Sequence, residues 1–180
     1  ANIQIYEKKI MKVVILAGGF GTRISEYTKK IPKPMIMINK KPIIVHIMEH
    51  YAKYGFNDFV IALGYKGPVI KKYLKKKNFN WNIDLIDTGL KTMTGGRVKR
   101  LEKILGNERF FMTYGDGISD LDINKLLEFH KRKKKLVTLT AVRPPARFGA
   151  LKLSGNKVTL FKEKNKINEG WINGGFFVIE

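Results

Sequence analysis

The segment MKVVILAGGFGTR, residues 11–23, decides the fold class of this chain. Residues 11–17 form a nearly uninterrupted apolar run rich in β-branched side chains, which is typical of a strand buried on both faces in a parallel sheet. Glycines follow at once, at Gly18, Gly19 and Gly21. Because ligands bind beyond the carboxyl ends of the strands in such sheets, this glycine-rich turn is the first candidate site.

Strand and helix patterns alternate along the rest of the chain. Further strands are expected at residues 58–63, 83–86, 110–114, 136–142 and 174–179, with a hairpin at 150–153 and 157–161. Helical patterns lie between Pro42 and Gly55 and over residues 68–73, 98–105 and 122–134. This alternation predicts an α/β fold with a mostly parallel sheet, and a length of 180 residues suffices for one domain with a sizeable core.

The composition excludes several classes of protein. Apolar residues make up 44% of the chain, which is too many for a disordered protein. The chain has no cysteine, so disulfides, zinc–thiolate sites and thiol nucleophiles are excluded, and a reducing cytoplasmic location is expected. No apolar run approaches the roughly 18 residues that cross a bilayer, and residues 1–10 lack the apolar region of a signal peptide.

The net charge of +20 raises the alternative of a nucleic-acid-binding module. Much of the excess lies in lysine clusters at residues 71–77 and 131–135, on or beside predicted helices, where charge runs usually face the solvent. Aromatic residues fall mostly within the predicted strands and helices, whereas a surface for single strands interleaves them with the basic residues. We therefore expect neither nucleic acid nor membrane as a partner, although the positive charge favours an anionic nucleotide.

The glycine-rich turn has the composition of a phosphate-binding loop. Closely spaced glycines let successive backbone N–H groups approach an anion, and Arg23 and Lys33 follow as cations for phosphate oxygens. The turn has neither the Lys-Ser/Thr ending of a P-loop nor a G-x-G-x-x-G pattern. Pro32 and Pro34 are expected to hold Lys33 in an extended segment. The competing interpretation is a tight turn followed by a surface Pro-Lys-Pro.

Asp116 is the candidate metal ligand. It follows the strand pattern at residues 110–114, and Gly115 and Gly117 on either side leave its carboxylate sterically open. One carboxylate together with substrate phosphates is a usual arrangement for Mg²⁺. The alternative is an aspartate that caps the next helix, but Asp120 and Asp122 are better placed for that.

His46 and His50 have the i,i+4 spacing of helical metal ligands. No third ligand is apparent in the sequence, and their neighbours Ile47, Met48 and Tyr51 form an apolar stripe. We expect both histidines at the surface or the core edge of the helix.

Taken together, six motifs resemble the sugar-phosphate nucleotidyltransferases, and within that family the cytidylyltransferases that act on glucose 1-phosphate. The motifs are LAGGFGTR (16–23), IPKPM (31–35), TMTGGR (92–97), TYGDG (113–117), RFGAL (147–151) and INGGFF (172–177). The resemblance implies a Rossmann-like three-layer α/β/α fold with a mostly parallel mixed sheet, the nucleotide-diphospho-sugar transferase fold. Residues 1–10 would be an N-terminal extension, and residues 11–180 a catalytic domain that is incomplete at its C-terminus.

The resemblance also implies a role for each matching residue. Contacts to the nucleoside would come from Leu16, Ala17, Gly18, Gly19 and Phe20. The triphosphate would lie against Gly21, Thr22, Arg23 and Lys33. Further nucleotide contacts would come from Thr92, Arg97 and Gly115. The sugar phosphate would meet Gly149, Glu163, Lys164, Asn173 and Gly174, although Glu163 and Lys164 taken alone are ordinary surface charges. The catalytic residues would be Arg23, Lys33 and Asp116, with Asp116 holding Mg²⁺.

The implied reaction is transfer of a cytidylyl group from CTP to glucose 1-phosphate, which gives CDP-glucose and pyrophosphate and supplies O-antigen and lipopolysaccharide biosynthesis. A homo-oligomer is expected for the full-length protein. Two alternatives remain beside the nucleic-acid module: a sibling enzyme that uses UTP or dTTP, and an inactive domain that senses nucleotide.

Overall fold

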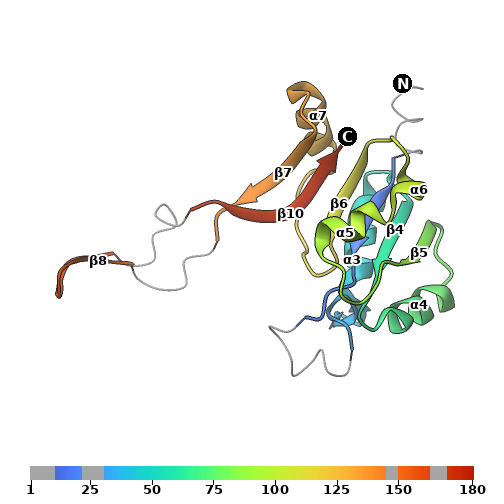
Figure 1. Ribbon diagram of the computed structural model, residues 1–180, viewed down its shortest axis with the longest axis horizontal. Helices are drawn as coiled ribbons and strands as arrows, with labels where there is room; N and C mark the ends of the chain where they lie inside the picture. Colours follow the sequence, from blue (N-terminus) through green and yellow to red (C-terminus); the bar gives the residue numbers. More distant parts are fainter. Residues whose placement is uncertain (1–10, 22–30, 145–149, 163–169) are drawn as a thin grey trace. The chain divides into compact units, whose positions relative to one another are not determined.

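The computed structural model describes residues 11–21, 31–144, 150–162 and 170–180 (Figure 1). The described residues form two compact units. The first comprises residues up to Thr138 together with Gly175–Glu180, and the second comprises Leu139–Gly174. Each unit is described by itself.

A mixed sheet of six strands has the order β5-β4-β1-β6-β10-β7. Its strands are β1 (Val13–Leu16), β4 (Asp58–Leu63), β5 (Asn82–Asp87), β6 (Phe110–Tyr114), β7 (Val137–Val142) and β10 (Ile172–Ile179). β1 pairs in parallel with β4 and β6, β4 pairs in parallel with β5, and β10 runs antiparallel to β6. The predicted mostly parallel mixed sheet is confirmed, and β4 and β6 have the predicted bounds.

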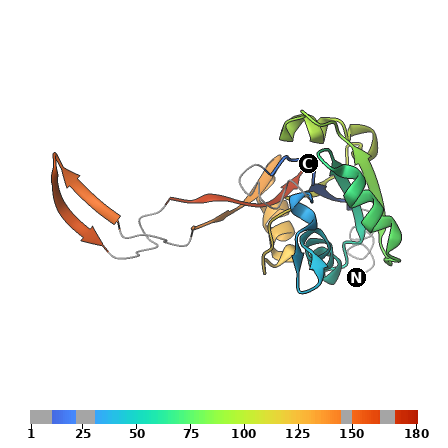
Figure 2. The same cartoon turned by 90° about the horizontal axis from the view of Figure 1, so that it is seen from below.

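Helices cover both faces of this sheet, as the three-layer prediction requires (Figure 2). The helices are α3 (Ile43–Lys53), α4 (Gly67–Lys76), α5 (Thr94–Lys99), α6 (Glu102–Leu105) and α7 (Ile123–Lys133). Buried side chains of α3, α4 and α7 share one apolar cluster with Val13 and Ile15, whereas Leu101 and Leu105 share another with Val14. Successive residues of β1 therefore face opposite clusters, which is why the strand is apolar throughout.

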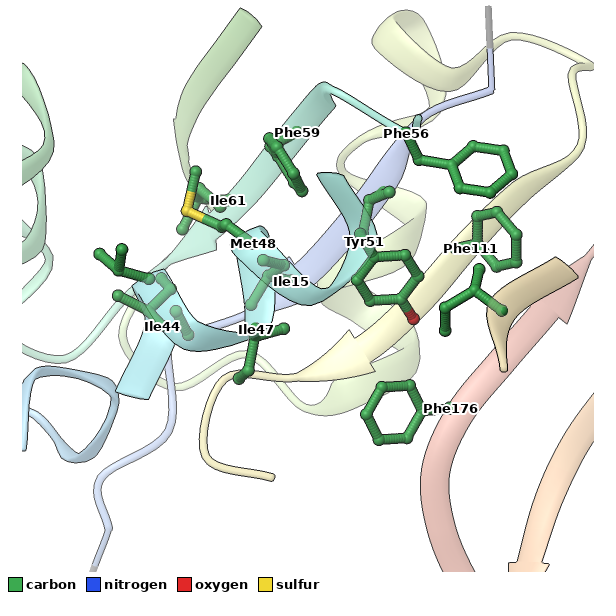
Figure 3. Close-up of a cluster of buried hydrophobic side chains, with 14 of the residues drawn as sticks. Ile15, Ile44, Ile47, Met48, Tyr51, Phe56, Phe59, Ile61, Phe111 and Phe176 are labelled. Atoms are coloured by element: carbon green, nitrogen blue, oxygen red, sulfur yellow. The ribbon is translucent and has the colours of Figure 1, made fainter. Parts of the chain in front are cut away.

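The larger apolar cluster is centred on α3 (Figure 3). Pro42 precedes this helix in an extended conformation, and Tyr51 and Met48 on its inner face are fully buried. The ring of Tyr51 stacks on Phe176, with centroids 6.1 Å apart. Phe176 belongs to β10, so this aromatic contact attaches the antiparallel strand to the helical layer.

One helix prediction was wrong. A single helix was expected at residues 98–105, but the chain forms α5 and α6 with a break at Arg100 and Leu101. α5 begins at Thr94 and so contains Gly95 and Gly96, which the low helix propensity of glycine disfavours. The first of the two helices is instead tied in place by Arg97, whose contacts are described below.

Smaller features agree with the sequence. α4 is longer than the predicted 68–73, and the lysines of the 71–77 cluster are exposed on it and after it, as expected. In the second unit, β8 (Ala150–Ser154) and β9 (Lys157–Lys162) form the predicted hairpin, with Gly155 at a φ of 56°. No helix of the described residues is both long and apolar enough to cross a membrane.

Candidate active site

A pocket of about 420 Å³ lies at the carboxyl ends of β1 and β6. It brings together segments that are far apart in the sequence: the glycine-rich loop, the Lys33 segment, the loop before α5, and the residues after β6. Its lining residues are Leu16, Ala17, Gly18, Gly19, Phe20, Gly21, Lys33, Pro34, Leu90, Lys91, Thr92, Met93, Thr94, Arg97, Tyr114, Gly115 and Asp116. The expectation that the chemically interesting residues follow the strands is confirmed.

The glycine-rich loop continues directly from β1. The backbone N–H of Ala17 still donates to Ala62 of β4, at 3.0 Å, and the chain then turns away from the sheet. The carbonyl of Gly18 accepts a hydrogen bond from the N–H of Tyr65 at 3.1 Å. The ring of Phe20, which is 45% exposed, packs against the ring of Tyr65 with centroids 5.3 Å apart. The loop therefore presents one apolar ring and several glycine backbones to the pocket.

Gly115 allows the Lys33 segment to approach the end of β6. Its N–H donates to the carbonyl of Leu16 at 2.9 Å. A Cβ at this position would lie 3.0 Å from Cγ of Pro34 and 3.1 Å from the Leu16 oxygen, which is closer than ordinary contact. Glycine thus brings Lys33 and Asp116, residues 83 positions apart, to the same end of the pocket.

Lys33 and Asp116 form an ion pair, with 2.5 Å between Nζ and Oδ2. Their side chains are 30% and 34% exposed. Lys33 lies at the start of a short 3-10 helix, Lys33–Met35, and only the preceding Pro32 is extended. The prediction of an extended segment is therefore wrong at Lys33 itself, because the N–H of Met35 bonds to the Pro32 carbonyl and closes a turn. The turn nevertheless leaves Lys33 on the pocket wall.

Asp116 is the one carboxylate among the described residues that line the pocket, and a single carboxylate suits magnesium only together with a ligand. Among the described residues, no three histidine, aspartate or glutamate side chains are grouped to hold a metal ion. Mg²⁺ in nucleotide sites is held by one or two carboxylates plus substrate phosphates. Asp116 therefore fits a metal that arrives with a triphosphate, whereas Asp122, as expected, caps α7 by accepting from the N–H of Lys125.

Arg97 lies in the pocket wall and is 5% exposed. Its Nη1 donates to the carbonyls of Leu63 (3.1 Å) and Gly89 (2.8 Å) and to Oγ1 of Thr88 (2.7 Å). Its Nη2 donates to the carbonyls of Gly18 (2.9 Å) and Leu90 (3.4 Å). Burial lowers the pKa of the Arg97 guanidinium, which remains cationic at neutral pH. Both terminal nitrogens are thus engaged with protein acceptors.

Thr92 also lines the pocket, and a second arginine holds it there. Nη1 of Arg100 donates to Oγ1 of Thr92 at 2.7 Å and to the carbonyl of Thr88 at 2.6 Å. Two arginines of one short segment therefore fix the loop that precedes α5. The predicted nucleotide contacts of Thr92 and Arg97 stay predictions.

Several predicted site residues are not placed in the pocket. Thr22, Arg23, Gly149, Glu163 and Lys164 lie outside the described residues. Asn173 and Gly174 lie on β10 in the second unit, which is described by itself, and their predicted roles stay predictions.

The histidine interpretation is confirmed. Nε2 of His46 bonds to the carbonyl of Ile38 at 2.9 Å, and Nε2 of His50 bonds to the carbonyl of Leu121 at 2.8 Å. Each ring thus has a separate structural partner at the edge of α3.

Sequence reasoning missed some of the pocket wall. Pro34, Leu90, Lys91, Met93, Thr94 and Tyr114 all line it. Tyr114 was predictable, because it ends β6 immediately before Gly115 and Asp116. The loop residues beside Thr92 were not, because only the fold of that loop shows which of them face the pocket.

Comparison with known proteins agrees with this geometry. Residues 12–180 match the nucleotidyl transferase family. The chain belongs to that family. It is 47% identical, over 192 aligned residues, to glucose-1-phosphate cytidylyltransferase of Salmonella typhi, an alignment that covers 94% of this chain and 75% of the relative. It is 38% identical to a probable glucose-1-phosphate cytidylyltransferase of Bacillus subtilis, with 94% and 74% covered. The chain is thus a nucleotidyltransferase similar to these enzymes.

Solved structures confirm the fold. The crystal structure of HddC from Yersinia pseudotuberculosis, complexed with GMP-PN, superposes with a TM-score of 0.72 at 30% identity, covering 95% of this chain and 77% of that one. A UDP-glucose pyrophosphorylase complexed with UDP-glucose superposes with a TM-score of 0.68 at 19% identity, which shows the same fold.

Proposed function

We propose that this enzyme transfers the cytidylyl group of CTP to α-D-glucose 1-phosphate, giving CDP-glucose and pyrophosphate. The pocket carries the proposal, because it joins the glycine-rich loop, Lys33 and Asp116 at one edge of the sheet. Relatives named glucose-1-phosphate cytidylyltransferase, at 47% and 38% identity over most of the chain, support the choice of base and sugar.

The pocket has the chemistry that this reaction requires. A phosphate oxygen of the sugar phosphate forms a bond to the α-phosphorus of CTP, and the bond between that phosphorus and the oxygen leading to the β-phosphorus breaks. Pyrophosphate leaves with that electron pair. The nucleophile is already an anion, so no strong general base is needed, and catalysis consists of positioning and charge neutralisation.

Lys33 provides a neutralising charge at the Asp116 end of the pocket, which Lys91 and Arg97 also line. Its Nζ is paired with Asp116 before substrate binds, and its side chain is 30% exposed, so it can turn toward an incoming phosphate. The backbone N–H groups of the glycine-rich loop orient the phosphate chain. On the sequence prediction, Arg23 adds a second cation to the same group.

Mg²⁺ is part of the proposal, and Asp116 is the residue that would hold it. When bound, the ion would neutralise phosphate charge and orient the reacting oxygens. A single carboxylate gives it little affinity by itself, so Mg²⁺ is expected to bind together with CTP rather than before it.

The choice of base separates this proposal from its close alternatives. The chain is also 33% identical to D-glycero-alpha-D-manno-heptose 1-phosphate guanylyltransferase of Campylobacter jejuni, with 76% of that protein covered. Uridylyl and thymidylyl transfer are the remaining alternatives. The loop around Thr92 and Met93 forms the side of the pocket that would distinguish the bases.

A panel of CTP, GTP, UTP, dTTP and ATP, each with Mg²⁺, tests the proposal by thermal shift and by release of pyrophosphate with glucose 1-phosphate. A nucleotide at 100 times its Kd stabilises the protein by about 2.7 kcal/mol. We expect the largest shift and turnover with CTP. A larger response to GTP, UTP or dTTP would assign another base, and no response to any nucleotide would contradict the proposal. Mannose 1-phosphate in place of glucose 1-phosphate tests the sugar.

The biological setting is proposed with the reaction. We place the enzyme in the cytoplasm, as a homo-oligomer that supplies CDP-glucose to O-antigen and lipopolysaccharide biosynthesis. Light scattering of the purified protein measures the oligomeric state, and a monomer at micromolar concentration would contradict that part.

A further inference from the structure

The peptide between Gly18 and Gly19 has its carbonyl held from the protein side. Nη2 of Arg97 donates to the Gly18 oxygen at 2.9 Å, and the N–H of Tyr65 donates to the same oxygen at 3.1 Å. The described chain has no cis peptide bonds. In a trans peptide the N–H points opposite to the C=O, so the N–H of Gly19 is directed away from Arg97.

Gly19 is exposed and lines the pocket. Within the described part of the chain its N–H has no hydrogen-bond acceptor, and a Cβ built on Gly19 would meet no heavy atom within 4 Å. The amide therefore stands open toward the space that the nucleotide would occupy. An N–H with this direction and exposure is a ready donor to an anionic oxygen.

The guanidinium of Arg97 occupies a slot that only glycines leave open. A Cβ at Gly64 would lie 2.5 Å from Nη1 of Arg97 and 2.7 Å from the Gly18 oxygen. A Cβ at Gly18 would overlap the same guanidinium. Gly64 does not line the pocket, so its glycine serves the arginine and the loop rather than a ligand.

Within the described part of the chain, the acceptors of Arg97 are neutral oxygens: four carbonyls and one hydroxyl. The full positive charge therefore polarises the peptide groups that it contacts, and the Gly18–Gly19 peptide is one of them. Polarisation of the carbonyl makes the N–H at the other end of that peptide a stronger donor. The charge of Arg97 thus strengthens a hydrogen-bond donor of the pocket by polarising the Gly18–Gly19 peptide.

We propose that Arg97 is a positioning residue that orients and polarises the Gly18–Gly19 peptide, so that the Gly19 N–H donates to a phosphate oxygen of the nucleotide. Through its bonds to Gly89 and Leu90, the same side chain also ties the loop that precedes α5 to the glycine-rich loop. The inference rests on the proposed function, because it assumes a nucleotide in this pocket. In this proposal Arg97 acts on the nucleotide through the backbone of the glycine-rich loop and does not contact the nucleotide directly.

The first test needs no destabilising variant. Protein labelled with ¹⁵N-glycine is titrated with Mg²⁺–CTP, inorganic pyrophosphate and cytidine, and the amide of Gly19 is followed by NMR. Gly19→Ala, which has room for its Cβ, identifies the resonance by its disappearance. We expect the Gly19 signal to move with CTP and pyrophosphate and to stay unchanged with cytidine. A Gly19 signal that ignores both phosphate ligands overturns the inference.

The second test uses Arg97→Lys, with Arg100→Lys as a matched control. A lysine cannot reach the acceptors of Arg97 at once, so we expect the Kd for Mg²⁺–CTP to rise about 10- to 100-fold, with less than about a threefold change for cytidine. Arg100 holds Thr92 and Thr88 but does not contact Gly18, so Arg100→Lys should leave the Gly19 response to pyrophosphate intact. Equal losses for CTP and cytidine in Arg97→Lys would indicate a direct contact to the nucleoside and overturn the inference.

These outcomes separate the inference from the proposed function. Pyrophosphate carries no base, so its effect on Gly19 does not depend on whether CTP is the substrate. A wild-type protein that responds to pyrophosphate at Gly19 but prefers another nucleotide contradicts the choice of CTP and supports the inference.

Discussion

Two arginines at opposite ends of the sheet are held in different ways. Arg97, at the pocket, is 5% exposed, and among the described residues it donates to neutral oxygens. Arg109, just before β6, is 30% exposed and pairs with Glu180, which also accepts from the buried His130. In the ion pair, the charges of Arg109 and Glu180 offset each other. The arginine bound to carbonyls keeps its positive charge beside a pocket for an anion.

The shifts in pKa express the same contrast. Burial lowers the pKa of Arg97, because desolvation opposes its charge and outweighs the attraction of the Asp87 carboxylate. At the other site, hydrogen bonding to Arg109 lowers the pKa of the Glu180 carboxyl. Burying the Arg97 charge costs free energy, whereas the bond between Arg109 and Glu180 stabilises both of their charges.

The largest expected difference between the two sites is in stability. Arg97→Met removes five hydrogen bonds of a buried guanidinium, so we expect the free energy of unfolding to fall by about 3 kcal/mol or more. Arg109→Met breaks a partly exposed pair and should cost about 1 kcal/mol. Urea unfolding of both variants measures the two losses. Equal losses would mean that the carbonyl contacts of Arg97 contribute no more than an ordinary ion pair.

Asp116→Ala is expected to impair catalysis while leaving the stability of the fold nearly unchanged. We expect turnover to fall by about 100-fold, which is the range for losing one preorganised electrostatic contact. The free energy of unfolding should change by less than about 1 kcal/mol, because the pair with Lys33 is one-third exposed. Pyrophosphate release and urea unfolding give the two values, with the exposed Asp120→Ala as control. Full turnover by soluble Asp116→Ala protein rules out this residue as the metal ligand.

Glu180→Gln probes the paired site through pH. The folded-state pKa of Glu180 lies below its ordinary value of 4.5, so its stabilisation is present above that pH and is lost as the pH falls through the folded pKa. We expect wild type to exceed Glu180→Gln by about 1 kcal/mol near neutral pH, a modest value because the side chain is 37% exposed. The gap should close below pH 4.5 in urea unfolding measured across pH. A gap that persists at lower pH would exclude this linkage.

The smallest effect is expected at a surface pair. Lys99 and Glu102 approach to 2.8 Å, but their side chains are 74% and 63% exposed. Lys99→Met should therefore change the free energy of unfolding by less than about 0.5 kcal/mol. The same urea assay sets the baseline for the other variants, and a larger loss would show that exposure is a poor guide to the value of ion pairs in this protein.

Sequence periodicity predicted most of the fold because the central strands β1, β4 and β6 are buried on both faces. β4 and β6 are apolar along almost their whole length, and their predicted bounds agree with the structure. The region after Thr92 was not predictable in this way. Its helix starts over two glycines and breaks at Arg100, because side-chain bonds from two arginines, rather than propensity, determine its course.

The site was predictable as a set of segments but not as a set of contacts. The glycine-rich loop, Lys33 and Asp116 stand out by composition and by their position after strands. The engagement of Arg97 with backbone carbonyls has no sequence signal, because an arginine in a glycine-containing motif reads equally well as a ligand for phosphate. Gly64 gave no signal either, since its importance arises only when the sheet brings it behind Gly18.

The slot around Arg97 also constrains how this sequence can change over generations. Gly18, Gly64 and Arg97 come from three separate segments, yet a methyl group at either glycine collides with the same guanidinium. A lineage that replaces Arg97 with a smaller residue removes the collision at Gly18, whereas Gly64 stays constrained by the Gly18 oxygen, which a Cβ there would approach to 2.7 Å. A change at Gly18 should therefore follow a change at Arg97 in evolution, while Gly64 should stay glycine whether or not Arg97 is replaced.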